Sequence, residues 1–104
     1  MNIGIIVKTN KSASELSNDW VPEPLGSKQF IYDTLSEILN VSVNSDEYTY
    51  DKNNILIYFT IENETNPKAI SVSYGSGNNE LKILHLICSI IGAKLYDGEA
   101  SDFI

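Results

Sequence analysis

The chain contains no arginine, one cysteine and one histidine among 104 residues. Without arginine there is no bidentate guanidinium to hold phosphate or read guanine, so nucleic-acid binding is not expected. The single cysteine, Cys88, excludes an intramolecular disulfide and gives no sign of an oxidising compartment. No stretch approaches the roughly 20 apolar residues of a membrane span, and the N-terminus lacks the basic segment of a signal peptide. We therefore expect one domain, residues 1–104, that resides in the cytoplasm and contacts no membrane.

The charge is strongly one-sided. Fourteen acidic residues oppose seven lysines, which gives a net charge of −7. Such a surface repels phosphate and attracts basic proteins, chiefly by raising the rate of association. Acidity also serves solubility alone, and the charge by itself does not separate the two interpretations.

Hydrophobic patterning predicts strands at 1–8, 55–62, 69–74 and 93–96. Helices are predicted at 27–40, with Ser27 as the cap, and at 80–91, where Gly92 suits the left-handed turn that ends a helix. Residues 9–26 form a long loop. The connection at 41–54 is mostly polar, and Tyr48-Thr49-Tyr50 is its one candidate for a short edge strand.

This order of elements predicts an α+β fold, the ferredoxin-like βαββαβ sandwich. Its sheet would have four antiparallel strands in the order 4-1-3-2, with two helices on one face. The first strand is apolar on both sides, so we expect it to be central and covered on both faces. The second helix has a spare apolar stripe, Ile83, Leu86 and Ile90. We expect cover for this stripe within the chain, with another chain as the alternative.

No set of side chains indicates catalysis, a metal or a cofactor. His85 and Cys88 are three residues apart on a helix, but His85 lies among polar residues and Cys88 lies about 60° away, toward the apolar face. A buried thiol without an electropositive neighbour is inert, and a metal site needs further ligands. No Ser/His/Asp set stands out. We therefore expect a protein that is not an enzyme and holds no cofactor.

The segment from Tyr74 to Glu80 joins a strand to a helix and contains Gly75 and Gly77. It lacks both the phosphate-loop and the dinucleotide patterns. We interpret the glycines as turn residues at positive φ and predict a helix cap at Asn78 or Asn79.

Two segments carry the residues best suited to bind another protein. In the loop at 9–26, Trp20 lies near acidic residues and is either an interface anchor or a plug over the second face of the core. The segment at 46–51 mixes acids with tyrosines and is either a binding surface or a solvated connection. If both segments reach one surface, their carboxylates would mimic a polyanion. The candidate partner-binding residues are Asp19, Trp20, Glu23, Asp46, Glu47, Tyr48, Tyr50 and Asp51.

The C-terminal LHLICSIIGAKLYDGEASDFI resembles the ends of small immunity proteins from bacterial polymorphic toxin systems, including contact-dependent growth inhibition. In those proteins an apolar helix, a Gly-Ala-like step and a strand closing on an aromatic-Asp pair recur. The resemblance covers about the last quarter of the chain and brings no catalytic residues with it. It implies a protein that binds and neutralises a cognate toxin, often a basic nuclease, inside the producing cell.

Two functions follow as hypotheses. The first is a non-enzymatic immunity protein whose Trp20 anchors a basic toxin domain. The alternative is a small-molecule regulatory module, because ACT-like domains share this order of elements and dimerise. In that alternative, the stripe of Ile83, Leu86 and Ile90 or a sheet edge would form a homodimer.

Overall fold

Two α-helices and six strands make up the chain, and the computed structural model describes all of residues 1–104. The elements, in chain order, are β1 (Asn2–Val7), the 3₁₀ turn η1 (Ala13–Glu15), α1 (Lys28–Leu39), β2 (Glu47–Lys52), β3 (Ile55–Ile61), β4 (Ile70–Tyr74), α2 (Asn78–Ile91), β5 (Lys94–Asp97) and β6 (Asp102–Phe103). The α+β class is therefore confirmed. No helix is long and apolar enough to cross a membrane.

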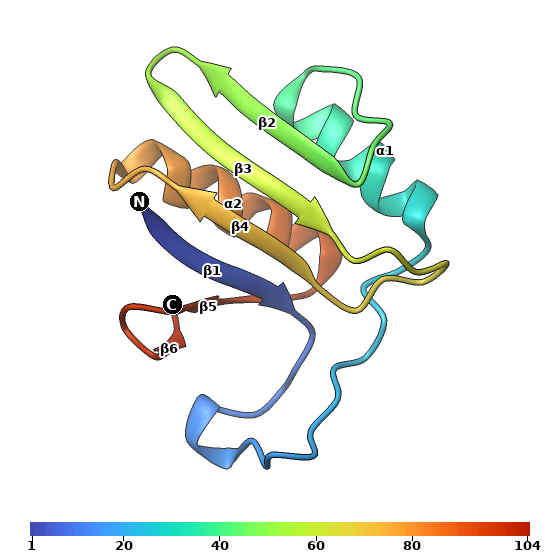
Figure 1. Ribbon diagram of the computed structural model, residues 1–104, viewed down its shortest axis with the longest axis vertical. Coiled ribbons are helices and arrows are strands. Elements are labelled where there is room, and N and C mark those ends of the chain that lie inside the picture. The colour runs from blue at the N-terminus through green and yellow to red at the C-terminus, as the bar shows by residue number, and fades with distance from the viewer.

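The six strands form one antiparallel sheet in the order β2-β3-β4-β1-β5-β6 (Figure 1). The prediction of four strands is wrong, since β2 and β6 extend the sheet at its two ends. The four strands expected from the sequence correspond to β1, β3, β4 and β5, and β2 contains Tyr48-Thr49-Tyr50, the candidate for a short edge strand. The ferredoxin-like assignment itself stays a prediction.

Both additional strands depend on tight turns. Asn53 and Asn54, between β2 and β3, have φ values of 54° and 63°. Asparagine tolerates this left-handed conformation, which a two-residue hairpin turn requires. After β5, one oxygen of the Asp97 carboxylate accepts the backbone N–H groups of Glu99 at 2.8 Å and Ala100 at 3.3 Å. This turn reverses the tail so that β6 pairs with β5.

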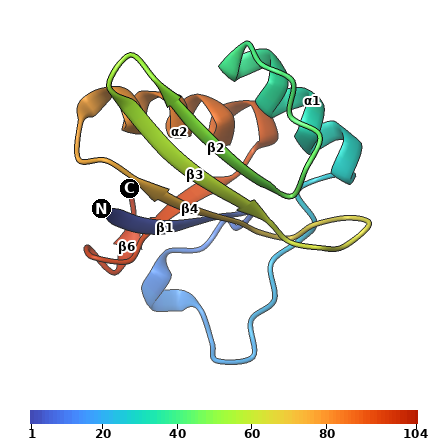
Figure 2. The same cartoon turned by 45° about the horizontal axis from the view of Figure 1, so that its top comes forward.

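Both helices lie on one face of the sheet, and the long loop lies on the other (Figure 2). The core forms between the helices and alternate residues of the strands. From the helices it contains Ile31, Leu35, Leu39, Leu84, Ile87, Cys88 and Ile91, and from the strands Ile6, Tyr50, Ile57, Phe59, Ile61, Ile70, Val72, Tyr74 and Leu95.

Two helix ends follow the sequence prediction. The Ser27 hydroxyl accepts the backbone N–H of Phe30 at 3.1 Å, which caps α1. Gly92 ends α2 with φ at 79°, and its N–H donates to the Cys88 carbonyl at 2.8 Å. These two predictions are confirmed.

The start of α2 differs from its prediction. Its N-cap is Gly77, whose φ is −77°, and no side chain caps the helix. Neither Gly75 nor Gly77 has a positive φ, so the turn interpretation is wrong. Space is the physical reason for both glycines. A Cβ at Gly75 would lie 2.5 Å from the carboxylate of buried Glu80, and one at Gly77 would lie 3.0 Å from it.

The outer surface of α2 remains partly uncovered. Leu86 is 50% exposed and Ile90 is 52% exposed, whereas Ile83 packs against the core. The prediction that the chain covers this whole stripe is therefore wrong for two of its three residues.

The face of the sheet that carries no helix, here called the helix-free face, is covered only in part. The loop at 9–26 crosses it beside β1, where Val7 is buried. Ile3, which lies four residues earlier on the same face of β1, is 67% exposed. The prediction that the first strand is covered on both faces is therefore wrong along the first half of β1.

Candidate functional site

The most apolar hollow on the protein lies on the helix-free face, under the loop at 9–26, and is called here the Trp20 groove. Its volume is about 320 Å³. Seven of its ten lining residues are hydrophobic, namely Ile5, Val7, Leu16, Trp20, Ala69, Tyr96 and Phe103. The other three are Pro22, Glu62 and Lys68. A hollow of this size and composition suits one or two large side chains of a partner.

The floor of the Trp20 groove follows from strand alternation. Ile5 and Val7 project from β1 away from the helices, because Ile6 between them faces the core. The register places Ile5 opposite Tyr96, and Tyr96 opposite Phe103. Three apolar side chains therefore stand in a row across β1, β5 and β6.

The tail completes one wall of this groove. The rings of Tyr96 and Phe103 meet edge to face, with centroids 5.6 Å apart at 80°. The ammonium of Lys94 lies 5.8 Å from the centre of the Phe103 ring. The backbone N–H of Ile104 donates to the Leu95 carbonyl at 2.9 Å, which holds the tail against β5. Phe103 is thus a binding-site candidate that the sequence analysis did not select.

The opposite wall is the turn between β3 and β4. The Glu62 carboxylate accepts the backbone N–H of Lys68 at 2.8 Å, and the N–H of Glu62 donates to Ala69 at 3.1 Å. The long loop is tied to the same turn, because the N–H of Leu25 donates to the Pro67 carbonyl at 2.8 Å. Backbone bonds therefore hold the loop in place over the sheet.

The predicted loop residues lie in or near this groove. Trp20 lines it and is partly buried, so it is neither a full plug nor free of the fold. Asp19, the preceding residue, is exposed. Glu23 is exposed and forms an isolated backbone bridge with Lys8, beside a second, more polar hollow that Trp20 also lines.

Asp46, from the second predicted segment, is used inside the fold. Its carboxylate accepts the Tyr32 O–H at 2.7 Å and the Lys28 ammonium at 2.9 Å. The bond from Tyr32, followed by that from Lys28, holds the pKa of Asp46 below its usual value, and the same bond raises the pKa of Tyr32. Asp46 therefore joins α1 to the start of β2.

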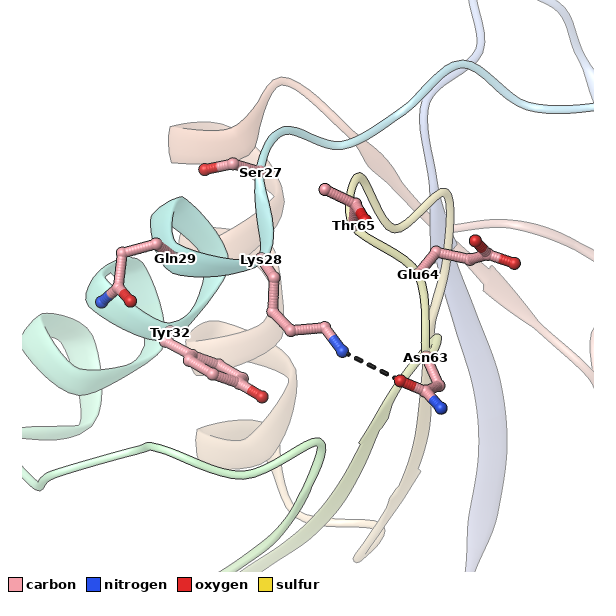
Figure 3. A pocket seen from close by; sticks show the side chains of 7 residues that line it. All are labelled: Ser27, Lys28, Gln29, Tyr32, Asn63, Glu64 and Thr65. Carbon is pink, nitrogen blue, oxygen red and sulfur yellow. Dashed lines mark hydrogen bonds between the residues drawn. The ribbon is translucent and has the colours of Figure 1, made fainter.

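Figure 3 shows the polar hollow beside this network, at the start of α1. Lys28 points from α1 to the amide oxygen of Asn63 at 3.2 Å (Figure 3). The backbone N–H of Lys28 donates to Thr65 at 3.1 Å, and the cap at Ser27 uses another N–H of the helix. The backbone N–H groups of Lys28 and Phe30 and the Lys28 ammonium therefore bond within the chain, so the hollow offers few donors to a ligand.

The remaining predicted residues divide between the two faces of β2. Tyr50 is buried in the core at 9% exposure, and Tyr48 packs against the core. Glu47 and Asp51 are exposed and project from the helix-free face. The two predicted segments are therefore not adjacent, because β3 and β4 separate β2 from β1 and its loop. At about 4.8 Å per strand spacing, β2 and β1 lie about 14 Å apart.

Two exposed apolar side chains lie on the helix-free face between the two predicted segments. Tyr58 on β3 is 43% exposed and Ile3 on β1 is 67% exposed. Both are in register with Ser73 on β4, so they form one row across the helix-free face. Strand alternation was the signal for these residues, but alternation alone does not say whether a face is covered.

The groups considered for reactive chemistry lie apart or are buried. His85 is exposed, while Cys88 is buried at 5% exposure, and burial raises the pKa of its thiol to about 11. Tyr74 is also buried, and burial together with Asp97 raises its pKa to about 12. No group of three His, Cys, Asp or Glu side chains is placed to hold a metal ion.

Comparison of the chain with protein-family models, with curated proteins and with solved structures gave no match.

Proposed function

We propose that this chain is a non-enzymatic protein that binds a basic protein partner through the helix-free face of its sheet. The observation that carries the proposal is the Trp20 groove, an apolar hollow that the loop at 9–26 leaves open. Large apolar side chains around such a hollow are typical of interface anchors, and Trp20 is the residue type found there most often.

The spacing of the exposed residues on this face supports the proposal. A standard protein interface takes about 800 Å² from each partner, or about 20 to 30 residues. A partner of that footprint would reach from the groove across Ile3 and Tyr58 to the exposed carboxylates of Glu47 and Asp51. The apolar row between the two predicted segments would then be covered instead of left in water.

Charge supports a basic partner. The net charge is −7 and there is no arginine, so the chain would attract lysine- and arginine-rich surfaces and repel nucleic acid. With the resemblance of residues 84–104 to bacterial immunity proteins, we propose that the partner is a toxin domain, neutralised in the cytoplasm of the producing cell. The ferredoxin-like arrangement belongs to the same proposal, with β2 and β6 as additions to it.

Co-expression with the protein domain encoded beside it in the genome tests the proposal. We expect a complex on size exclusion that dissociates as salt rises. Trp20→Ala should weaken the complex at least about tenfold, the size of a moderate anchor effect. Leu86→Ala, on the opposite surface of the protein, is the matched control and should leave affinity within about twofold. A complex whose affinity changes neither with salt nor with Trp20→Ala contradicts the proposal. The absence of any complex contradicts it as well.

One observation favours the alternative of a dimeric, ACT-like small-molecule module. Leu86 and Ile90 are half exposed on α2, and a second copy of the chain would cover them. Light scattering that gives a dimer, together with a thermal shift from an amino acid, would support this alternative. A strict monomer with no shift across an amino-acid panel would exclude it.

A further inference from the structure

One side of the sheet ends in a long open strand. β2 pairs with β3 alone, and its six residues span about 20 Å. At the other side of the sheet, β6 has only two residues. β2 is therefore the edge at which a strand from another chain could continue the sheet.

The backbone of β2 is arranged for such an addition. The N–H of Ile61 donates to the Asp46 carbonyl at 2.7 Å. These two residues continue the register by one pair beyond Glu47 and Thr60, so they form a hydrogen-bonded pair. Hydrogen-bonded and non-bonded pairs alternate along an antiparallel ladder. Glu47, Thr49 and Asp51 therefore direct their N–H and C=O groups away from β3. Only the N–H of Glu47 has a partner, the Ser45 hydroxyl at a long 3.4 Å.

The side chains of the same three residues indicate, by their charge, which kind of strand could pair with β2. Glu47, Thr49 and Asp51 are exposed and project from the helix-free face. Directly opposed residues on paired strands lie about 5 Å apart, so opposite charges there stabilise and like charges destabilise. In an antiparallel pair of two β2 strands centred on Thr49, Glu47 would face Asp51 twice. The edge therefore repels a second copy of itself in this register and favours a basic strand.

We propose that the β2 edge accepts an extended basic segment of the partner, which continues the sheet. Two lysine or arginine residues, four positions apart on that segment, pair with Glu47 and Asp51. This inference rests on the proposed function and adds the mode of recognition. The charges on an edge strand also protect a sheet from aggregation, and the experiment below separates the two roles.

The probe is a blocked seven-residue peptide with lysine at its second and sixth positions, threonine at its first, fourth and seventh, and valine at the others. The same peptide with glutamate in place of lysine is the matched control. Amide chemical shifts and hydrogen exchange of the full chain are measured at low salt. We expect the lysine peptide to shift and protect the amides of Glu47, Thr49 and Asp51, and the glutamate peptide to leave them unchanged.

Thr49→Pro removes one outward N–H and no bond to β3, so the strand should persist. Thr49→Pro should lower the affinity for the lysine peptide at least about tenfold. Thr49→Val keeps the N–H and should not lower it. The double variant Glu47→Lys, Asp51→Lys alters only exposed side chains and should reverse the preference between the two peptides.

If the lysine peptide shifts amides of the Trp20 groove, and Thr49→Pro does not change these shifts, this inference is overturned. The proposed function is then unaffected. Equal binding of the lysine and glutamate peptides overturns this inference as well, as does the absence of any shift on β2. The proposed function is decided separately, by the salt and Trp20→Ala dependence of the co-expressed complex.

Discussion

The phenolic hydroxyl of Tyr32 on α1 donates a 2.7 Å hydrogen bond to Asp46, the residue before β2. Lys28, one helical turn before Tyr32, bonds to the other oxygen of the same carboxylate at 2.9 Å. One side chain therefore fixes the open edge strand to the helix layer.

Replacement of Asp46 by asparagine should loosen this attachment. The amide cannot accept both donors as strongly as a carboxylate does. Because Asp46 is 27% exposed, solvent screening reduces the expected loss of stability. We expect a fall of about 1 kcal/mol in the free energy of unfolding, measured by denaturant titration. Asp33→Asn, at an exposed position of α1, is the control and should change stability by less than about 0.5 kcal/mol. Equal effects of the two substitutions would mean that the Asp46 bonds do not stabilise the fold.

Acid should remove the contribution of Asp46 and Asp97 to the stability of the fold. Hydrogen bonds hold the pKa of Asp46 and of Asp97 below the usual value, chiefly from Tyr32 to Asp46 and from the Glu99 N–H to Asp97. Because the folded-state pKa lies below that of the unfolded chain, about 4, this stability is present above pH 4 and is lost as the pH falls through the folded-state values. Denaturant midpoints of the native chain and of the Asp46→Asn, Asp97→Asn variant should therefore converge as the pH is lowered from 7 to 3. A constant difference would contradict this assignment.

Gly4 should tolerate no side chain. A Cβ there would lie 2.7 Å from the backbone oxygen of Tyr96 and 3.0 Å from Leu95, so β1 and β5 would have to separate. Gly4→Ala should cost about 2 kcal/mol in unfolding free energy. Gly75→Ala is the matched comparison, because its close neighbour is the movable end of the Glu80 side chain. We expect a clearly smaller loss for Gly75→Ala in the same denaturant titration, and the reverse order would contradict the packing.

The two sides of α2 should respond differently to truncation. Leu84 is fully buried, so Leu84→Ala should cost about 2 to 5 kcal/mol. Leu86 is 50% exposed, and Leu86→Ala should cost less than about 1 kcal/mol in a monomer. A loss at Leu86 that grows with protein concentration would show that a second copy covers this surface, as the dimeric alternative requires.

The sequence was sufficient wherever a local signal determined the structure. Ser27 and Gly92 end their helices as predicted, because a cap and a left-handed turn depend on a few adjacent atoms. Alternation located β1, β3, β4 and β5, since the buried face of each strand is apolar. The ends of the sheet were harder to predict. Tyr48-Thr49-Tyr50 was a candidate for an edge strand, and β2 includes these residues, but only its two tyrosines face the core. β6 has two residues, too few to show a period.

The candidate site was predicted in part for the same reason. Trp20 was selected by its residue type, and the structure places it beside an apolar hollow. Phe103 and Tyr58 depend on register across several strands, which composition does not reveal. Asp46 and Tyr50 were selected for charge and aromatic character, and the fold uses both internally.

Amide hydrogen exchange on the complex with the co-expressed partner tests the central claim most directly. We expect new protection at the loop around Trp20, along β2 and at the tail around Phe103, with none on the outer surface of α2. Protection confined to the surface around Leu86 and Ile90 would contradict the account, because the partner would then bind the helix layer instead of the helix-free face.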